Sequence, residues 1–219
     1  MEVTLVSYTQ PAVGTPAAGP EDLVAYCARV SSNRDESKRA QDYEKLLDYL
    51  IKHKHWSPFE MVDATVSIKA PRDITRQLIR HRSFSFQEFS QRYSDQITTE
   101  GRYYRMQDEK NRQNSLDVFT LEELDSLYDL EAEALMASMR VYDQMRDMGV
   151  AKECARVVLP EGLTQSHLYM KGSLRSWIHY LEVRRGEETQ DEHRGLADLI
   201  LEALEPVFPV TLGVVSESN

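Results

Sequence analysis

The feature that most constrains the fold is a long helical pattern between Thr120 and Gly149. Thr120 and Glu123 have the spacing of a capping box, in which two side chains satisfy free backbone N–H groups at a helix start. Gly149 is a residue type typical of a helix C-terminus. Between these ends, apolar side chains recur at helical spacing on one face: Leu124, Leu127, Leu135, Met139, Tyr142 and Met145. A helix this long needs partners for that face, so the sequence predicts a helix-rich domain.

Shorter patterns predict the other elements. Two segments alternate between apolar and polar residues and are predicted strands: Val3–Tyr8 and Met61–Lys69. Helices are predicted from Pro20 to about Val30, over Ala40–Lys54, from Pro71, over Ser173–Glu182 and over Thr189–Leu204, with Pro206 and Pro209 ending the helical region. Residues 94–115 are polar and irregular, which predicts a loop or lid. The predicted class is α+β, mostly helical with a small mixed or antiparallel sheet, in a single domain over residues 1–219.

Composition narrows the class of protein. The apolar fraction of 41% is enough for a core, and no run of 18 apolar residues predicts a membrane span. A net charge of −10 argues against a general nucleic-acid binder, which would present a basic face. The N-terminus lacks the basic and apolar regions of a secretory signal. Cys27 and Cys154 are therefore expected to be free thiols, and the expected location is the cytoplasm.

A cationic segment stands out in this acidic chain. From Lys69 to Arg92 there are six cations and only two anions, Asp73 and Glu88. The simplest functional interpretation is a site for a small anionic ligand. The alternative is an ordinary solvated face with salt bridges. Interleaved aromatic residues weaken that alternative, since a solvated turn would not need them: Phe84, Phe86, Phe89 and Tyr93.

The chain has no glycine-rich phosphate loop, so side chains must hold any phosphate. Arginine suits this task because its planar donors match phosphate oxygens. Arg76 and Arg80 are four residues apart and are expected to share a helix face. A second cationic cluster lies further along, but nearby glutamates make the solvated alternative stronger there: Arg156, Lys171, Arg175, Arg184 and Arg185.

The sequence supports a nucleophilic or a metal site less well than it supports an anion-binding site. Cys27 lies on an apolar helix face and Cys154 lies between Lys152 and Arg156, and packing is the better explanation for both thiols. Ser90 suits ligand binding better than nucleophilic attack. His53 and His55 lack further ligands at metal spacing, so no metal site is predicted.

The segment from Arg80 to Tyr93 resembles the signature of flavin-dependent thymidylate synthases (the ThyX family). The match consists of Arg80-His81-Arg82, seven residues and Ser90, with Glu88, Arg92 and Tyr93 in place. Three further segments resemble family motifs: His55–Glu60, Ala155–Pro160, and Leu174–Ser176 with Val183, Arg184 and Gln190. The chain departs from the usual pattern at Gln87, Ser173, His179 and Glu188.

The resemblance implies reductive methylation of dUMP to dTMP. The carbon donor would be 5,10-methylenetetrahydrofolate, and FAD reduced by NADPH would supply the hydride in place of chemistry at an enzyme thiolate. It also implies a homotetramer with active sites at subunit interfaces, and no nucleic-acid or membrane partner. Two alternatives remain open: a flavin-binding NADPH oxidase-like relative without synthase activity, and a non-catalytic nucleotide- or RNA-binding module.

The resemblance also assigns residues. Arg184 would be the catalytic residue, pairing with the uracil edge. The residues expected to bind dUMP are Gln77, Arg80, Glu88, Phe89, Ser90, Gln91, Arg92, Arg156 and Arg184. Those expected to bind FAD are Ser57, Arg80, His81, Arg82, Glu88, Ser173, Arg175 and His179. His55 and Tyr93 would border the pocket for folate or nicotinamide.

Overall fold

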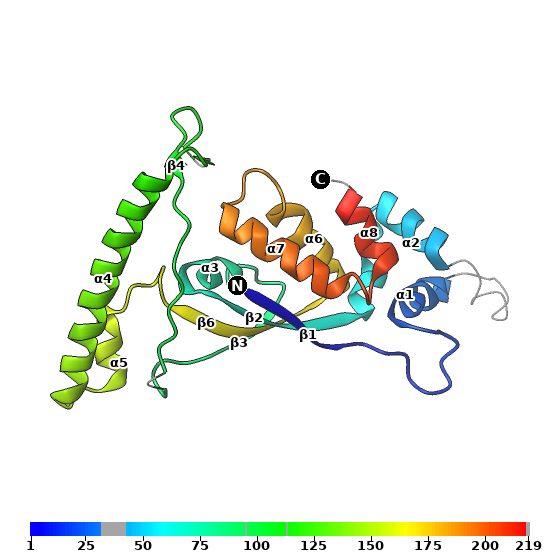
Figure 1. Cartoon of the computed structure of the whole chain (residues 1–219). Coiled ribbons are helices and arrows are strands. Elements are labelled where there is room, and N and C mark those ends of the chain that lie inside the picture. The colour runs from blue at the N-terminus through cyan, green and yellow to red at the C-terminus, as the bar shows by residue number, and fades with distance from the viewer. Residues whose placement is uncertain (32–42, 95, 113, 218–219) are drawn as a thin grey trace. The chain divides into compact units, whose positions relative to one another are not determined.

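The computed structural model describes residues 1–31, 43–94, 96–112 and 114–217 (Figure 1). The chain divides into two compact units. Unit 1 comprises Met1, Lys69–Arg80 and Glu88–Leu168, and unit 2 comprises Glu2–Ile68, His81–Gln87 and Tyr169–Asn219. The chain therefore passes from one unit to the other several times, and two of these passages lie within the cationic segment, after Arg80 and after Gln87.

Most elements belong to a single unit. Unit 2 holds β1 (Glu2–Tyr8), α1 (Pro20–Ala28), η1 (Arg29–Ser31), α2 (Tyr43–Lys52), η3 (Ser57–Met61), α6 (Leu174–Arg184), α7 (Asp191–Leu204) and α8 (Pro209–Glu217). Unit 1 holds α3 (Arg72–Leu78), β4 (Met106–Gln107), β5 (Ser115–Leu116), α4 (Leu121–Asp147), α5 (Lys152–Ala155) and η4 (Arg156–Val158). Three strands have residues in both units: β2 (Asp63–Pro71), β3 (Ser85–Glu88) and β6 (Gln165–Ser173).

The main sheet has four strands in the order β1-β2-β6-β3. In unit 2, helices α6 and α7 cover one face of this sheet (Figure 1). Alternate residues of β2 are buried, as expected for a strand covered on one face: Ala64, Val66 and Ile68. They share the interior of unit 2 with buried side chains of the two helices: Leu174, Trp177, Ile178, Leu181, Leu196, Ala197, Ile200 and Leu204.

Unit 1 is organised around α4. The predicted capping box is present, because Thr120 Oγ1 accepts from the Glu123 backbone N–H and the Glu123 side chain accepts from the Thr120 backbone N–H. Strands β4 and β5 pair antiparallel just before this helix. In the described part of the chain, no helix combines the length and the apolarity that a bilayer span requires.

The fold class is confirmed as mostly helical with a small sheet. Strands β1 and β2 and helices α1, α4, α6 and α7 lie close to their predicted positions. The predicted helix over Ala40–Lys54 is confirmed as α2 from Tyr43, and its first three residues lie outside the described ones.

Four details of the predicted secondary structure were wrong. Helix α3 ends at Leu78, so Arg80 does not share a helix face with Arg76; the backbone N–H of Arg80 bonds to Gln77 O in a tighter turn. Strand β3 forms within the cationic segment, and β6 forms where no element was predicted. Pro209 begins α8, because proline fits the first helical position as well as it ends a helix.

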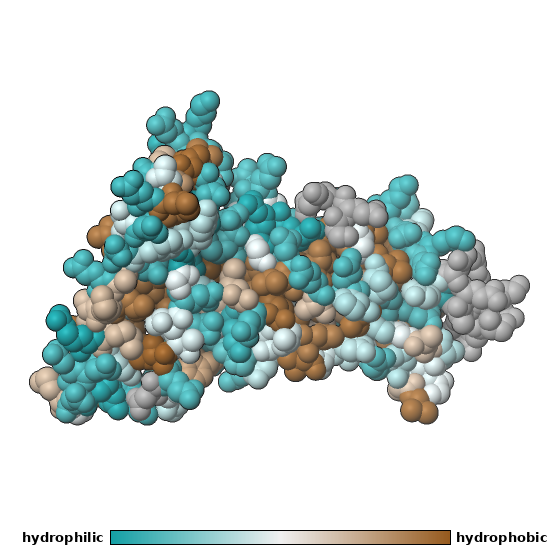
Figure 2. Space-filling view, viewed as in Figure 1, coloured by the Kyte–Doolittle hydropathy of each residue, from teal (hydrophilic) through white to brown (hydrophobic). Residues whose placement is uncertain are grey.

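The apolar face of α4 also differs from expectation. Only Leu124 and Tyr142 of the six predicted core residues are buried, and the other four are half-buried. Elsewhere on the helix, Leu130 is 63% exposed and Met136 is 67% exposed. Figure 2 shows such apolar residues among hydrophilic ones over α4. One chain by itself therefore covers α4 incompletely.

Candidate active site

Unit 1 contains a polar pocket of about 490 Å³. Its lining combines three arginines with two glutamates and a few smaller groups: Arg72, Arg76, Gln91, Glu153, Arg156, Val157, Leu159, Glu161 and Thr164. Helix α3 supplies Arg72 and Arg76, the segment from α5 to Glu161 supplies five residues, and Gln91 follows β3. The arginine forks and the volume suit a phosphorylated ligand of nucleotide size.

Arg72 is far more enclosed than Arg76, whose side chain is 52% exposed. The Arg72 side chain is 12% exposed, and its Nη1 atom has no hydrogen-bond partner within the described residues. The nearest carboxylate oxygen is Glu88 Oε1, at 3.9 Å from Nη1, which is too long for a hydrogen bond. Burial lowers the pKa of Arg72, as do Arg76 and Arg156, while Glu88 opposes this shift. The group still carries its charge, since arginine stays protonated in proteins.

Four other charged side chains at the pocket form two ion pairs, and Arg156 bonds to a backbone oxygen. Arg76 Nε donates to Glu161 Oε1 at 2.8 Å, and Arg92 Nε lies 3.4 Å from Glu153 Oε2. Arg156 Nε donates to the backbone oxygen of Glu153 at 3.3 Å.

Glu88 lies at the end of β3 and is fixed by a neighbouring strand. Ser166 Oγ on β6 donates to Glu88 Oε1 at 2.7 Å, and the backbone N–H of Phe89 donates to His167 O. Gln91 follows in the same segment and is buried against the pocket. Strand pairing thus places the acidic residue of the signature beside Arg72, a relation that the sequence spacing alone did not reveal.

Among the expected dUMP ligands, only Gln91 and Arg156 line this pocket. Glu88 and Arg92 do not line the pocket but form ion pairs with two residues that do, Arg72 and Glu153. Ser90 Oγ accepts a hydrogen bond from the Arg92 backbone N–H. Arg80 and Phe89 are exposed and Gln77 is half-buried, and none of the three lines the pocket. Tyr93, expected near folate, is 79% exposed, with the Arg92 guanidinium 5.8 Å from its ring centroid.

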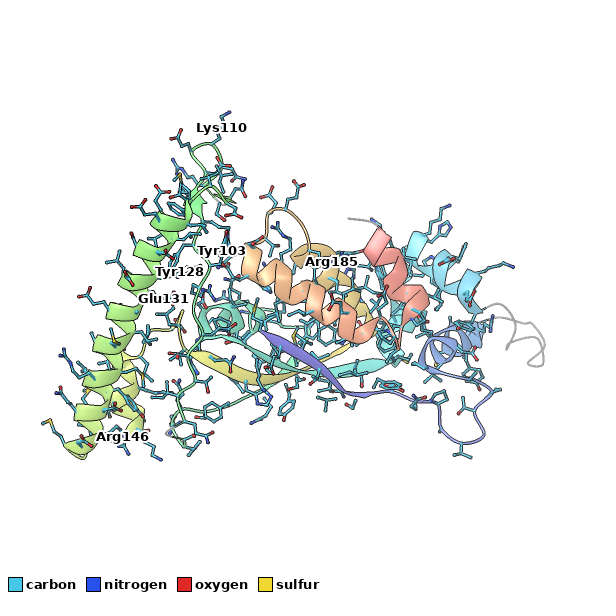
Figure 3. All side chains as sticks on the ribbon, viewed as in Figure 1. Tyr103, Lys110, Tyr128, Glu131, Arg146 and Arg185 are labelled. Carbon is cyan, nitrogen blue, oxygen red and sulfur yellow. The ribbon has the colours of Figure 1, made fainter. Side chains whose placement is uncertain are left out.

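A network behind the pocket holds α3 in unit 1. Arg102 donates to Asp73, which follows Arg72, at 2.9 Å. The Arg102 backbone N–H and the Tyr104 hydroxyl both donate to Glu131 Oε2 on α4, at 3.1 and 2.7 Å. In Figure 3, Tyr128 and Glu131 on α4 lie toward the segment that carries Tyr103. This network ties the start of α3 to the long helix.

In unit 2, Arg184 contacts the histidine of the signature. Arg184 Nε donates to His81 Nε2 at 2.9 Å. Burial lowers the pKa of His81, and the charge of Arg184 lowers it further. Behind this pair, the Tyr180 hydroxyl lies 3.2 Å from Nε2 of the fully buried His193. The sequence assigned Arg184 to dUMP and His81 to FAD and did not predict their contact, and it did not single out Tyr180 or His193.

The remaining expected FAD residues of unit 2 have varied surroundings. Ser57 and Arg82 are exposed. Arg175 Nη1 donates to Glu60 at 3.0 Å, and the His179 ring packs edge-on against Trp56. Ser173 caps α6, because its Oγ accepts from the Ser176 backbone N–H. His55, expected at the folate pocket, is exposed.

The two cysteines are not among the residues that line the pocket. Cys27 is half-buried and Cys154 is exposed, and both are free thiols. No group of three or more potential metal-ligating side chains occurs in the described ranges. Arg72, Glu153, Glu161 and Thr164 line the pocket but were not among the expected ligands. Of these four, the sequence analysis had singled out only Arg72, as one of the six cations between Lys69 and Arg92.

The chain is similar to known proteins over most of its length. Residues 4–210 match the family described as thymidylate synthase complementing protein. The flavin-dependent thymidylate synthase of Synechocystis is 48% identical over 200 residues, which cover 90% of this chain and 91% of that protein. That of Thermus thermophilus is 36% identical over 204 residues, covering 91% and 73%. The structure of the UMP/dUMP methylase PolB from Streptomyces cacaoi bound with 5-Br UMP superposes with a TM-score of 0.81 at 26% identity, over 98% of this chain and 93% of that chain. The chain therefore belongs to the flavin-dependent thymidylate synthase family.

Proposed function

We propose that this chain catalyses the reductive methylation of dUMP to dTMP, with 5,10-methylenetetrahydrofolate as carbon donor and NADPH as the source of electrons. The observation that carries the proposal is the arginine-lined pocket of unit 1, found in a chain of this family. Without a glycine-rich loop, a nucleotide must be held by side chains, and the pocket offers guanidinium and carboxamide donors for that purpose.

The nucleotide is assigned first to the pocket residues Gln91 and Arg156, and to Glu88, Ser90 and Arg92 beside them. Gln77, Arg80 and Phe89 remain proposed ligands on the basis of the signature alone. In this assignment Arg92 exchanges its ion pair with Glu153 for hydrogen bonds to the phosphate. The exchange costs little free energy, because both side chains are more than half exposed and such a pair is weak.

The residues of unit 2 fit a flavin nucleotide. Exposed Ser57 and Arg82 and the surface pair of Arg175 with Glu60 provide hydroxyl and guanidinium donors for a pyrophosphate. His81, Ser173 and His179 complete the set within unit 2, and Arg80 and Glu88 remain proposed FAD ligands on the basis of the signature alone. When bound, FAD supplies the reducing equivalents of the reaction.

Arg184 is proposed to bind the uracil edge and to favour its anionic form. A guanidinium held in place stabilises negative charge that develops on the pyrimidine without reorganising during the reaction. His81 holds Arg184 by accepting from its Nε, which leaves the terminal nitrogens of the guanidinium available to a ligand.

Three further assignments complete the proposal. Exposed His55 and Tyr93 provide stacking surfaces for folate or nicotinamide.

Self-association into a homotetramer would cover the apolar residues that α4 leaves exposed, among them Leu130 and Met136. The two units are proposed to form one catalytic domain, which acts in the cytoplasm.

The test is the absorbance spectrum of the purified protein, followed by addition of dUMP, the folate donor and NADPH. We expect a flavin spectrum and formation of dTMP. A protein that takes up no flavin when FAD is supplied contradicts the proposal. Flavin binding with NADPH oxidation but no dTMP favours the oxidase-like alternative. A colourless protein whose nucleotide binding falls steeply with salt favours the non-catalytic alternative.

A further inference from the structure

Arg72 is not part of the family signature and was not among the expected ligands, yet it lines the pocket and its side chain is far less exposed than those of Arg76 and Arg92. Its guanidinium is 12% exposed, and Nη1 is buried without a hydrogen-bond partner within the described residues. A buried charged donor without a hydrogen-bond partner costs free energy. Such a group in a ligand pocket therefore points to a ligand that supplies the acceptor.

The backbone presents this side chain in a fixed position. The Arg72 N–H donates to Thr164 O at 2.9 Å, and its carbonyl oxygen accepts from Thr75 Oγ1 at 3.0 Å. Asp73, the next residue, is held by Arg102. A guanidinium on an anchored backbone loses less entropy when it binds a ligand than one on a mobile segment.

The charges around Arg72 define the ligand. Of the carboxylates that line the pocket, Glu161 pairs with Arg76 and Glu153 faces Arg92. Glu88 approaches Arg72 only to 3.9 Å while it accepts from Ser166. Arg156 forms no ion pair with any residue of the described ranges. Arg156, and Arg72 with only the more distant Glu88 opposite it, are thus the guanidinium groups that can still bind an anion such as a phosphate monoester.

We propose that Arg72 binds the phosphate of the nucleotide and makes the pocket select a nucleoside monophosphate over the nucleoside. This inference rests on the proposed function, because the ligand is the same dUMP. It assigns to Arg72 a part in substrate specificity. Glu88 offsets part of the charge of Arg72 but lies too far from Nη1 to accept a hydrogen bond from it.

The experiment compares the binding of dUMP and deoxyuridine by isothermal titration to the full-length wild type and to Arg72→Gln and Arg72→Lys. A charge-assisted hydrogen bond makes the expected loss of dUMP affinity for Arg72→Gln about tenfold to a hundredfold. Deoxyuridine affinity is expected to stay within about twofold, since the nucleoside lacks the group that Arg72 binds. Arg72→Lys should lie between, because lysine keeps the charge but not the fork.

A matched control removes the same charge elsewhere in unit 1. Arg112, exposed in the turn between β4 and β5, does not line the pocket, so Arg112→Gln should leave both affinities unchanged. A second readout is pH. The second pKa of a phosphate monoester is about 6, so the wild type should bind dUMP more tightly at pH of about 7.5 than at about 5.5. This increase in dUMP affinity with pH should be smaller in Arg72→Gln.

Equal losses of dUMP and deoxyuridine affinity in Arg72→Gln would show that Arg72 only supports the pocket and would overturn the inference. Unchanged dUMP affinity in a folded Arg72→Gln variant would also overturn it. A wild type that binds dUMP no better than deoxyuridine overturns it as well. If the wild type binds no dUMP at all, the proposed function itself fails. Failure of the proposed function can thus be distinguished from failure of the inference about Arg72.

Discussion

Arg184 Nε donates a hydrogen bond of 2.9 Å to His81 Nε2 within unit 2. A histidine nitrogen that accepts from a guanidinium carries no proton, so His81 is neutral with its proton on Nδ1. Protonation of Nε2 would remove the acceptor and set two cations against each other. The histidine of the signature thus has a definite partner and a definite charge state.

We expect Arg184→Ala to lower kcat/KM for dTMP formation by about a hundredfold to a thousandfold, the range seen when one donor to a developing anion is removed. Bound flavin should remain, as its absorbance spectrum would show. The neighbouring Arg185, labelled in Figure 3, is the matched control. Arg185 bonds to Asp198 and to Val215 O, so Arg185→Ala should lower the free energy of unfolding while the folded enzyme keeps its activity. Normal turnover by Arg184→Ala would exclude its proposed role.

Acidification should destabilise the protein through His193. Burial and the charges of Arg184 and His81 lower the pKa of His193 to about 3, from 6.5. Below pH 6.5 the unfolded state therefore binds a proton that the folded state does not, and stability is lost as the pH falls toward about 3. The loss approaches about 1.4 kcal/mol per pH unit for this residue. Urea unfolding between about pH 8 and about pH 5 measures it.

His193→Gln is the comparison for that pH series. The variant loses the ionisable ring next to Tyr180, so its unfolding free energy should fall less steeply with acid than that of the wild type. If the unfolding free energies of the two proteins fall in parallel with pH, the pKa of His193 is the same in the folded and unfolded states and the prediction is wrong.

Gly172 on β6 leaves room for Phe84 of the signature. A Cβ at Gly172 would overlap the Phe84 ring, which packs edge-on against Trp177 at 4.6 Å between centroids. Gly172→Ala should therefore destabilise the protein by about 1–3 kcal/mol, the usual range for an overpacked core. Gly195 on α7 is the control, because a Cβ added there would meet no neighbouring side chain of the described residues within 4 Å, and Gly195→Ala should stabilise the helix by up to about 1 kcal/mol. Thermal unfolding of both variants tests the contrast.

Glu131 should stabilise the segment that precedes α4. It accepts from the Arg102 backbone and from the Tyr104 hydroxyl, and burial together with this bond raises the pKa of Tyr104 to about 12. Glu131→Ala should cost about 1–3 kcal/mol, since two partly buried donors lose their partner. Glu133→Ala, at an exposed position of the same helix, should change the free energy of unfolding little. Amide exchange at Arg102 should quicken in the Glu131 variant alone.

Local patterns predicted much of the fold. The capping box at Thr120 and Glu123 located the start of α4, because those two side chains act on backbone groups only three residues away. Strand β6 escaped prediction, since its alternation of Ser166, Leu168, Met170 and Gly172 mixes small and polar residues with apolar ones. Pro209 was misassigned because a proline starts helices as well as ending them.

The sequence by itself determined the family, through the signature at Arg80 to Tyr93, and it predicted an anionic ligand from the arginines and the missing glycine loop. Only the tertiary structure decided which arginines are committed to partners. Arg76 is paired with Glu161, which lies 85 residues away, whereas Arg72 is enclosed without an acceptor for Nη1 among the described residues. The electrostatic state of a side chain depends on distances and burial in the folded chain, and residue spacing does not specify either one.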